Sequence, residues 1–415
     1  MILVLASEAV KVMGRGSVSD LDEFRLEVRS WLEDNCPASM RTDMPADEIV
    51  WGGTKQHWFH PEAKQWMEVM AKRGWTVPHW PKKYGGGGLY SKQHKILLDE
   101  MDRINARVPL QSFGMWMLGP ALLEFGSEEQ KKHYLPQIAR GEIRWCQGYS
   151  EPGSGSDLAG LQTKAEDKGD HYLVNGAKIW TSYADQSDWI FCLVRTDADA
   201  PKQQGISFLL FDMASEGVSA SPIQLISGAS IFCQTFFDNV KVPKHQLVGE
   251  TNQGWTIAKR LLQHERNMVS VITGNSALAR ASTPKLDVLA KQYLGNGDGR
   301  ISDEVIRDRV CRHQMDNKAF KLTMKRSSSE AKAGKADGNA ASFIKYYNSE
   351  QNKRKYECML QVLGTNMLGW EGAGFDEQEL DCTRQWLRSR ANSIEGGTSE
   401  VQLNIIAKRI LGLPD

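Results

Sequence analysis

The order of hydrophobic periodicities restricts the fold of this chain more than any other feature of its sequence. From Ser19 to about Arg140 apolar residues recur every three or four positions, which is the spacing of amphipathic helices. From about Arg144 to Pro243 the apolar runs have strand length and are separated by turn residues. After Gly254 helical spacing returns and continues to the end. This order favours a four-helix bundle with a β insert over alternating βαβ units.

Local signals place several individual elements. Pro61 is favoured in the first turn of a helix, and Ser127 with Gln130 forms a capping box before another. Asn175-Gly176 lies between apolar runs and is the strongest short signal for a β-hairpin, so we expect a tight turn there. Further strands are predicted at 189–195, 206–213 and 236–242. The helices predicted after the β module are 255–290, 302–335, 338–368, 377–390 and 399–411.

Composition excludes several classes of function. Lys plus Arg and Asp plus Glu both number 51, so the formal net charge is zero. This balance does not indicate a nucleic-acid-binding surface or a polybasic membrane anchor. No stretch approaches the roughly 20 apolar residues of a membrane span. The seven cysteines form no CxxC pair and no His/Cys cluster, so we expect no metal site and reduced thiols in a cytoplasm. Residues 1–17 lack the features of a signal peptide and need not belong to the natural chain, so they are left out of the fold.

The densest group of glycines and hydroxyls lies at residues 147–157, where the chain passes from helical to β spacing. Its sequence is Gln-Gly-Tyr-Ser-Glu-Pro-Gly-Ser-Gly-Ser-Asp. Small residues let a backbone approach a bulky ligand, and Ser150 and Ser156 offer hydroxyl groups. A plain surface loop explains the glycines equally well. The segment matches neither a Walker loop nor a GxGxxG turn that opens a helix.

This segment resembles the acyl-CoA dehydrogenase signature, in which an aromatic or polar residue leads into Thr/Ser-Glu-Pro-x-x-Gly-Ser-Asp. Residues 178–182, Lys-Ile-Trp-Thr-Ser, are similar to the second flavin strand of that family. Residues 236–255 resemble the exit from its β domain, and 395–414 resemble its closing motif. Each likeness is weak alone, but the ordered set covers most of the chain from Trp75 to the end and is highly specific.

The resemblance implies a mainly α protein with a β insert and three domains. We expect a helical N-terminal domain at residues 18–143, a β-sandwich-like middle domain at 144–250 and a C-terminal four-helix bundle at 251–415. FAD would lie between the last two domains. The residues that the resemblance assigns to FAD are Gln147, Tyr149, Ser150, Ser156, Trp180, Ser182, Arg300, Gln361, Gly364, Thr365, Thr398 and Glu400.

Some of these assignments carry further expectations. Ser156 would also touch the substrate at its boundary with the flavin. For Trp180, which would pack on the flavin ring, the alternative is an ordinary sheet-core tryptophan. The run Gln361-Val-Leu-Gly-Thr365 is similar to a family segment that reaches the FAD of a neighbouring subunit, so we expect a homotetramer. A heteromer stays open.

Two departures from the family pattern stand out. The family's Arg-x-x-Phe-Gly motif, which contributes to the FAD site of a neighbouring subunit, cannot be identified in this sequence. Arg300 is only a weak match to its arginine. Many members carry the catalytic base in Tyr-Glu-Gly-Thr. Alignment on Gly397-Thr398 puts Gly396 at the position of the base and Glu395 one residue too early.

A second carboxylate can fill this vacancy. Ala258, Leu261 and Leu262 belong to an apolar helical stripe, and Glu265 falls in the middle of that stripe. A lone carboxylate there needs a partner or a task, because burying an unpaired charge costs several kcal/mol. The resemblance places the base of isovaleryl- and long-chain-type members at this point, just before a substrate-side arginine, here Arg266. A buried salt bridge is the alternative interpretation.

The resemblance therefore implies α,β-dehydrogenation of an acyl-CoA, with Glu265 as base and Glu395 as second choice. Arg266, Ser156 and Gly397 would contact the substrate, and an electron-transfer flavoprotein would reoxidise the FAD. Two alternatives stay open. One is a two-component flavin monooxygenase of the same fold, and the other is a non-catalytic subunit of a heteromeric dehydrogenase. The sequence does not reveal the acyl chain.

Overall fold

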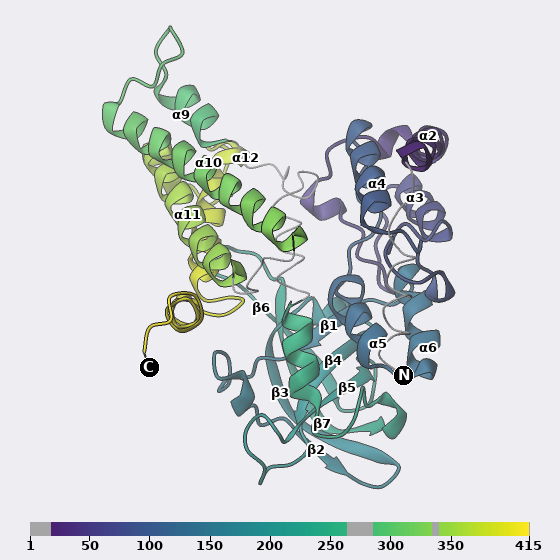
Figure 1. Cartoon of the computed structure of the whole chain (residues 1–415). Coiled ribbons are helices and arrows are strands. Elements are labelled where there is room, and N and C mark those ends of the chain that lie inside the picture. The colour runs from purple at the N-terminus through teal and green to yellow at the C-terminus, as the bar shows by residue number, and fades with distance from the viewer. Residues whose placement is uncertain (1–17, 264–284, 334–339, 415) are drawn as a thin grey trace.

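The computed structural model describes residues 18–263, 285–333 and 340–414, in which helices form the first and last regions and strands the middle one (Figure 1). The two helical regions rise from the same end of the sheet, on the right and on the left of the view. The fold expected from the order of periodicities is confirmed. Among the described helices, none is long and apolar enough to cross a membrane.

The N-terminal region packs its helices around a core of large apolar side chains, among them Trp66, Met70 and Leu122. Both local helix signals are confirmed. Ser127 Oγ accepts a hydrogen bond from the Gln130 backbone N–H at 3.2 Å, and Gln130 Oε1 accepts one from the Ser127 N–H at 3.0 Å. The helices are α2 (Val18–Asn35), α3 (Pro61–Lys72), α4 (Ser91–Arg103), α5 (Gly119–Phe125) and α6 (Glu128–Ala139), with a π-helical turn at Gly114–Leu118.

The middle region is a seven-stranded sheet in the order β1-β4-β2-β3-β7-β6, with β5 paired to β4. All three strands predicted between 189 and 242 are present. The pairs β1·β4 and β2·β4 are parallel, and the remaining pairs are antiparallel. The strands are β1 (Trp145–Gly148), β2 (Lys164–Asp167), β3 (His171–Ser182), β4 (Trp189–Arg195), β5 (Ile206–Asp212), β6 (Val218–Ile223) and β7 (Phe232–Pro243).

The hairpin expected at Asn175-Gly176 is wrong, because both residues lie inside β3. The turn between β2 and β3 is formed instead at residues 168–170, where the Lys168 N–H donates to the His171 carbonyl at 2.9 Å. Gly176 has φ +148° at a register shift against β7, and a Cβ there would lie 2.7 Å from the Thr163 Cα. The glycine therefore serves a close approach between backbones, which the sequence motif cannot distinguish from a turn.

The C-terminal region is a helical bundle in which α11 packs against α9, α10, α12 and α13. Residues 254–263 are helical, and the remaining elements are α9 (Leu286–Leu294), α10 (Glu304–Lys332), α11 (Ala340–Leu363), α12 (Glu377–Ser389) and α13 (Ser399–Ile405). The single helix expected over 255–290 is wrong at its end. Lys285 is extended (φ −66°, ψ 139°), and a proline at position 284 lacks the N–H of a helix interior.

The helix α13 is capped by Thr398, whose Oγ1 accepts a hydrogen bond from the Val401 N–H at 3.2 Å. Gln402 Nε2 reaches back to the Gly396 carbonyl at 3.3 Å instead of the cap N–H. The segment before α13 is therefore tied to the first turn of the helix.

A buried ion pair fastens the glycine-rich loop to the sheet. Lys178 on β3 is fully buried, and its Nζ lies 2.7 Å from Glu151 Oε1 and 3.1 Å from the Tyr149 carbonyl. Glu151 also accepts hydrogen bonds from the backbone N–H groups of Gln162 (2.6 Å) and Thr163 (2.9 Å). Burial by itself raises the pKa of Glu151, but the ammonium and the donors outweigh it and the pKa is lowered overall.

Lys178→Met should destabilise the protein by about 3 kcal/mol at pH 7, because it leaves Glu151 buried without its cation. The stabilisation from Glu151 is present above the ordinary glutamate pKa of about 4.3 and is lost as pH falls through the lower folded-state pKa. In the variant, the unpaired carboxylate protonates first. The deficit measured by urea unfolding should therefore shrink toward pH 4.

Lys241→Met, at an exposed position of the neighbouring strand β7, is the matched control and should change stability by less than about 0.5 kcal/mol. Equal losses in the two variants, or a Lys178→Met deficit independent of pH, would show that the pair does not hold the loop.

Candidate functional site

The strand β3 carries an exposed tryptophan in a strained conformation. Trp180 has φ +60° and lies where the β3·β7 register shifts between Lys178 and Thr181. Its side chain is 52% exposed and meets the Phe232 ring edge-on, with centroids 6.0 Å apart. The alternative of a sheet-core tryptophan is therefore wrong. A left-handed non-glycine residue costs of order 1 kcal/mol, and such strain gathers at ligand sites. The bulge presents an aromatic face that a planar ligand can cover.

The end of β3 is anchored to the N-terminal region by a contact that the sequence does not reveal. Tyr183 follows Ser182 with φ +53°, and its ring lies 5.1 Å from that of Trp51. The Arg144 guanidinium lies over both rings, 4.8 Å from Tyr183 and 5.2 Å from Trp51. Ser182 is half-buried beside this group. Neither the positive φ values nor the cation–π contacts between distant segments can be predicted from the sequence around these residues.

The two flavin-like motifs lie side by side. The Ser150 carbonyl accepts a hydrogen bond from the Ile179 N–H at 2.8 Å, which joins the loop after β1 to β3. Gln147 on β1 has a buried side-chain Nε2 with no hydrogen-bond partner in the described part of the chain. Tyr149 is directed into the core, edge-on to Phe191 and Phe208, so only its backbone can face a ligand.

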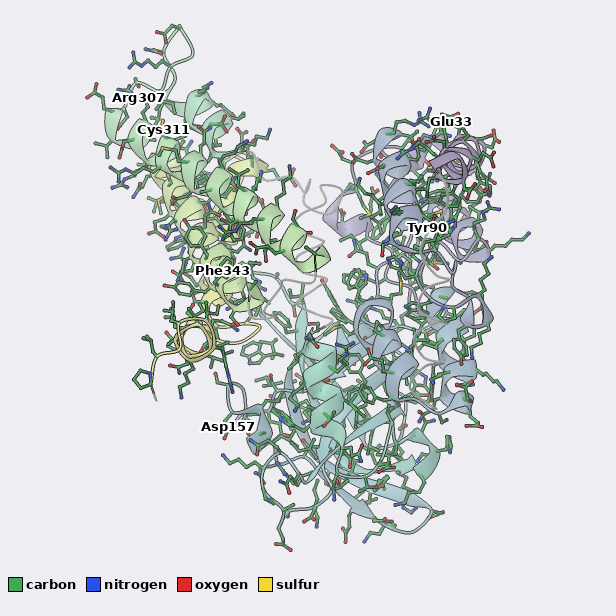
Figure 2. The ribbon with its side chains drawn as sticks, in the orientation of Figure 1. Glu33, Tyr90, Asp157, Arg307, Cys311 and Phe343 are labelled. Atoms are coloured by element: carbon green, nitrogen blue, oxygen red, sulfur yellow. The ribbon has the colours of Figure 1, made fainter. Side chains whose placement is uncertain are left out.

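The loop at residues 151–157 is open above this junction. A Cβ placed at Gly153 or Gly155 would meet nothing within 4 Å, and Ser156 is exposed. Asp157 pairs with Lys202 at 2.6 Å and lies on the side of the middle region nearest α13 in Figure 2. The glycines therefore leave room for a ligand over the loop.

Arg388 links the C-terminal region to the neighbourhood of Trp180. The guanidinium of Arg388, on α12, lies 5.9 Å from the centre of the Phe232 ring, the ring that touches Trp180. Its Nη2 donates to Glu395 Oε2 at 2.6 Å, and Asn392 Nδ2 donates to Glu395 Oε1 at 2.6 Å. Residues 392–398, called here the closing turn, are therefore joined to the bulge of β3. The sequence gives no signal for Arg388.

Several predicted residues belong to the closing turn and its helix. Gly396 and Gly397 both have positive φ, +63° and +89°, which glycine adopts readily. Thr398 caps α13, so its hydroxyl hydrogen stays available for a further acceptor. Glu400 is exposed in the first turn of α13. The turn offers left-handed glycine backbone and polar groups beside Arg388, whose guanidinium contacts Phe232 next to Trp180.

Other predicted residues lie away from this junction within one chain. Gln361, Gly364 and Thr365 are exposed near the end of α11, and Gln361 Oε1 accepts a hydrogen bond from Arg309 on α10. Arg300 is in the loop between α9 and α10, at the tip of the C-terminal region farthest from the sheet (Figure 1), the end where Figure 2 labels Arg307. Glu265 and Arg266 lie outside the described residues.

A cavity of about 660 Å³ lies beside the junction, between the β6–β7 connection and α12. Arg384, Arg388 and Trp370 line it on the helical side, and Ser227 lines it on the sheet side. Ser227 Oγ and Arg388 Nη1 are both buried without a hydrogen-bond partner in the described ranges. The sequence analysis did not identify this cavity, because its walls come from distant segments.

These features fit a large planar ligand with hydrogen-bond acceptors. The exposed Trp180 ring, the unpaired Gln147 amide and the open loop around Gly153 together suit an isoalloxazine and its polar substituents. Within residues 18–263, 285–333 and 340–414, no group of three or more His, Cys, Asp or Glu side chains is placed to hold a metal ion. The residues present therefore fit FAD.

Comparison with known proteins agrees with this geometry. The N-terminal, middle and C-terminal domains of acyl-CoA dehydrogenase match residues 19–142, 146–240 and 252–411. The chain is 33% identical to acyl-CoA dehydrogenase IpdE1 of Mycobacterium tuberculosis over 398 residues, which cover 96% of this chain and 99% of that protein.

Two solved structures share the fold over nearly the whole chain. One is described as the Tcur3481-Tcur3483 steroid ACAD (TM-score 0.73, 29% identity, 97% of this chain and 100% of that one). The other is the ChsE4-ChsE5 complex from Mycobacterium tuberculosis (TM-score 0.70, 28% identity, 97% and 100%). This chain therefore belongs to the acyl-CoA dehydrogenase family, whose members are flavin-dependent oxidoreductases that act on CH–CH bonds.

Proposed function

We propose that this protein catalyses FAD-dependent α,β-dehydrogenation of an acyl-CoA thioester, with Glu265 as the base. The observation that carries the proposal is the junction of the Trp180 bulge, the Ser150 loop and the closing turn in a chain of this family. FAD, when bound, would supply the hydride acceptor for the β-hydrogen. The task of the protein is then to bind the thioester, exclude water and remove the α-proton.

The proposal for Glu265 rests on the helix that precedes it. Ala258 and Leu261 are fully buried on the described part of that helix, and Arg260 on its exposed side pairs with Glu124 of α5 at 2.8 Å. In the sequence, position 265 follows Leu261 by four residues, which is the spacing of residues on one face of a helix. A carboxylate desolvated by substrate and flavin would have its pKa raised toward neutrality, as a base requires.

Glu395 is poorly suited to be the base, because both of its carboxylate oxygens are already engaged. Arg388 and Asn392 each donate to one of them at 2.6 Å, and the side chain is 41% exposed. Its contacts instead support a structural task in the closing turn.

The acyl group and the electron acceptor are proposals from the relatives. The Tcur3481-Tcur3483 structure is described as a steroid enzyme, so a steroid-type acyl-CoA is the first bulky substrate to test beside simple fatty acyl-CoAs. Caffeyl-CoA reductase subunit CarC of Acetobacterium woodii, 31% identical over 351 residues, is named as part of an Etf complex. An electron-transfer flavoprotein is therefore the proposed acceptor.

We also propose that the chain works as an oligomer. Gln361 and Thr365 are exposed near the end of α11, and Gln361 contacts Arg309 of α10, so both residues are available to a neighbouring subunit's FAD. The ChsE4-ChsE5 structure is described as a complex of two different proteins. A heteromer is therefore the second candidate. Thr365 stands where the family's Gln-x-x-Gly-Gly-x-Gly run has its second glycine, and this departure fits a chain that contributes little to the FAD site of a neighbouring subunit.

The purified protein should be yellow, with about one FAD per chain, and should bleach anaerobically with a suitable acyl-CoA. The ratio of flavin absorbance to protein and an anaerobic titration measure this directly. A colourless protein that gains no flavin absorbance on titration with FAD would contradict the assignment. Oxygen consumption with supplied reduced flavin, but no bleaching by acyl-CoA, would favour the monooxygenase alternative.

Glu265→Gln should leave FAD bound and acyl-CoA binding largely intact, because size and polarity are kept. It should lower the rate of flavin reduction by about 10²–10⁴-fold, because the proton acceptor is gone. Glu395→Gln is the matched control and should retain most activity. Stopped-flow absorbance of the flavin separates the two steps. The reverse pattern would move the base to the closing turn, and two near-normal variants would argue against α-proton abstraction.

Light scattering of the FAD-replete protein should give four times the chain mass of 46.6 kDa, as expected for a dimer of dimers. The physical reason is that Gln361, Gly364 and Thr365 are exposed at the end of α11 and are available to contact another subunit. An active, FAD-replete monomer would overturn this proposal. A chain that binds FAD only after mixing with a second gene product would instead establish the heteromer.

A further inference from the structure

One lysine of α11 forms hydrogen bonds with both ends of the closing turn. Lys345 Nζ donates to the Gly397 carbonyl at 2.7 Å and to the Asn392 carbonyl at 2.9 Å. These two carbonyls stand at the two ends of the stretch that contains Glu395 and Gly396. One ammonium group therefore fixes the span of the turn, because charge-assisted hydrogen bonds are short and directional. Figure 2 labels Phe343, two residues before Lys345, at the end of α11 nearest the sheet.

Further side chains of α11 secure the flanks of the turn. Asn352 Nδ2 donates to Asn392 Oδ1 at 2.9 Å. Glu350 accepts hydrogen bonds from the hydroxyls of Ser393 (2.9 Å) and Ser399 (3.4 Å). These contacts stabilise the ends of the segment, but neither reaches the glycines between them. Lys345 alone among these three α11 side chains holds the backbone at Gly397.

The opposite side of the turn faces the flavin-like bulge. Glu395 is held by Arg388, whose guanidinium lies over Phe232, and Phe232 touches Trp180. The turn is therefore held by α11 through Lys345 and by α12 through Arg388, which also contacts Phe232 of β7. A shift of its backbone would change the distance between Trp180 and the groups at Gly397 directly.

The surroundings of Lys345 combine burial with three carboxylates. Burial lowers its pKa overall, and the carboxylates of Glu395, Glu350 and Glu400 oppose part of that shift. A Cβ at Gly396 would lie 4.0 Å from the Lys345 Cε, so the lysine stem lies alongside the glycine that occupies the position of the family's base. The left-handed glycines have little intrinsic preference for one conformation and need such an external constraint.

We propose that Lys345 is a positioning residue of the cofactor site, which sets the backbone of the closing turn for FAD and for the acyl thioester. This inference rests on the proposed function. Lys345 touches neither ligand and takes no part in the proton transfer. Its contribution is preorganisation, because a turn held in one conformation does not have to be ordered when the ligands bind.

Lys345→Met keeps the length of the stem and removes the ammonium. In the full-length protein it should weaken FAD binding about tenfold, measured by quenching of flavin fluorescence. At saturating FAD it should also slow flavin reduction by acyl-CoA about tenfold, with a smaller change in KM. Lys345→Arg should restore both within about threefold, because a guanidinium can also reach two carbonyls.

Lys355→Met is the matched control, since Lys355 lies on the same helix, burial also lowers its pKa, and it does not contact the closing turn. It should leave FAD affinity and reduction rate unchanged. Should Lys345→Met fail to fold, Lys345→Gln, which keeps an uncharged NH2 donor group, is measured instead and should show an intermediate loss. Either variant with wild-type FAD affinity and reduction rate, or a loss as large in Lys355→Met, would overturn the inference. A wild-type protein that binds no FAD would instead reject the proposed function.

Discussion

The ion pair between Lys178 and Glu151 is the contact on which the rest of the site depends. It is buried and joins the glycine-rich loop to β3 at the residue before the register shift that exposes Trp180. An enclosed pair is costly to form, so it stabilises only where further donors complete it, and Gln162 and Thr163 do so here. The loop and the bulge are therefore set as one unit.

The site is completed by parts that contact this unit from two sides. The N-terminal region supplies Trp51, which with Arg144 supports the end of β3. The C-terminal region supplies Arg388 and the closing turn. A cofactor bound at such a junction can be enclosed by three regions without being part of any single core, and closure between regions excludes water from the reaction.

Much of the fold could be predicted because its signals are local. Hydrophobic spacing located the helices, and Ser127 with Gln130 marked a cap that the structure contains. The hairpin predicted at Asn175-Gly176 was wrong, because these two residues occur both in tight turns and where two backbones approach closely. The close approach of Thr163 to Gly176 distinguishes the two cases, and it is seen only in the structure. The conformations at Trp180 and Tyr183 and the contacts of Arg144, Arg388 and Lys345 depend on segments far apart in the chain. Hydrophobic periodicity does not predict these conformations and contacts. The motif resemblance located the candidate site, while the role of Glu265 stays a prediction.

Hydrogen–deuterium exchange with and without FAD tests most directly whether these segments form one flavin site. On addition of FAD, amides in residues 147–156, 178–183 and 394–400 should slow together, and those in α6 should exchange as before. The account requires all three segments to respond, because each forms part of one site. Binding of FAD that protects none of them, or that protects the sheet segments while the closing turn exchanges unchanged, would contradict it.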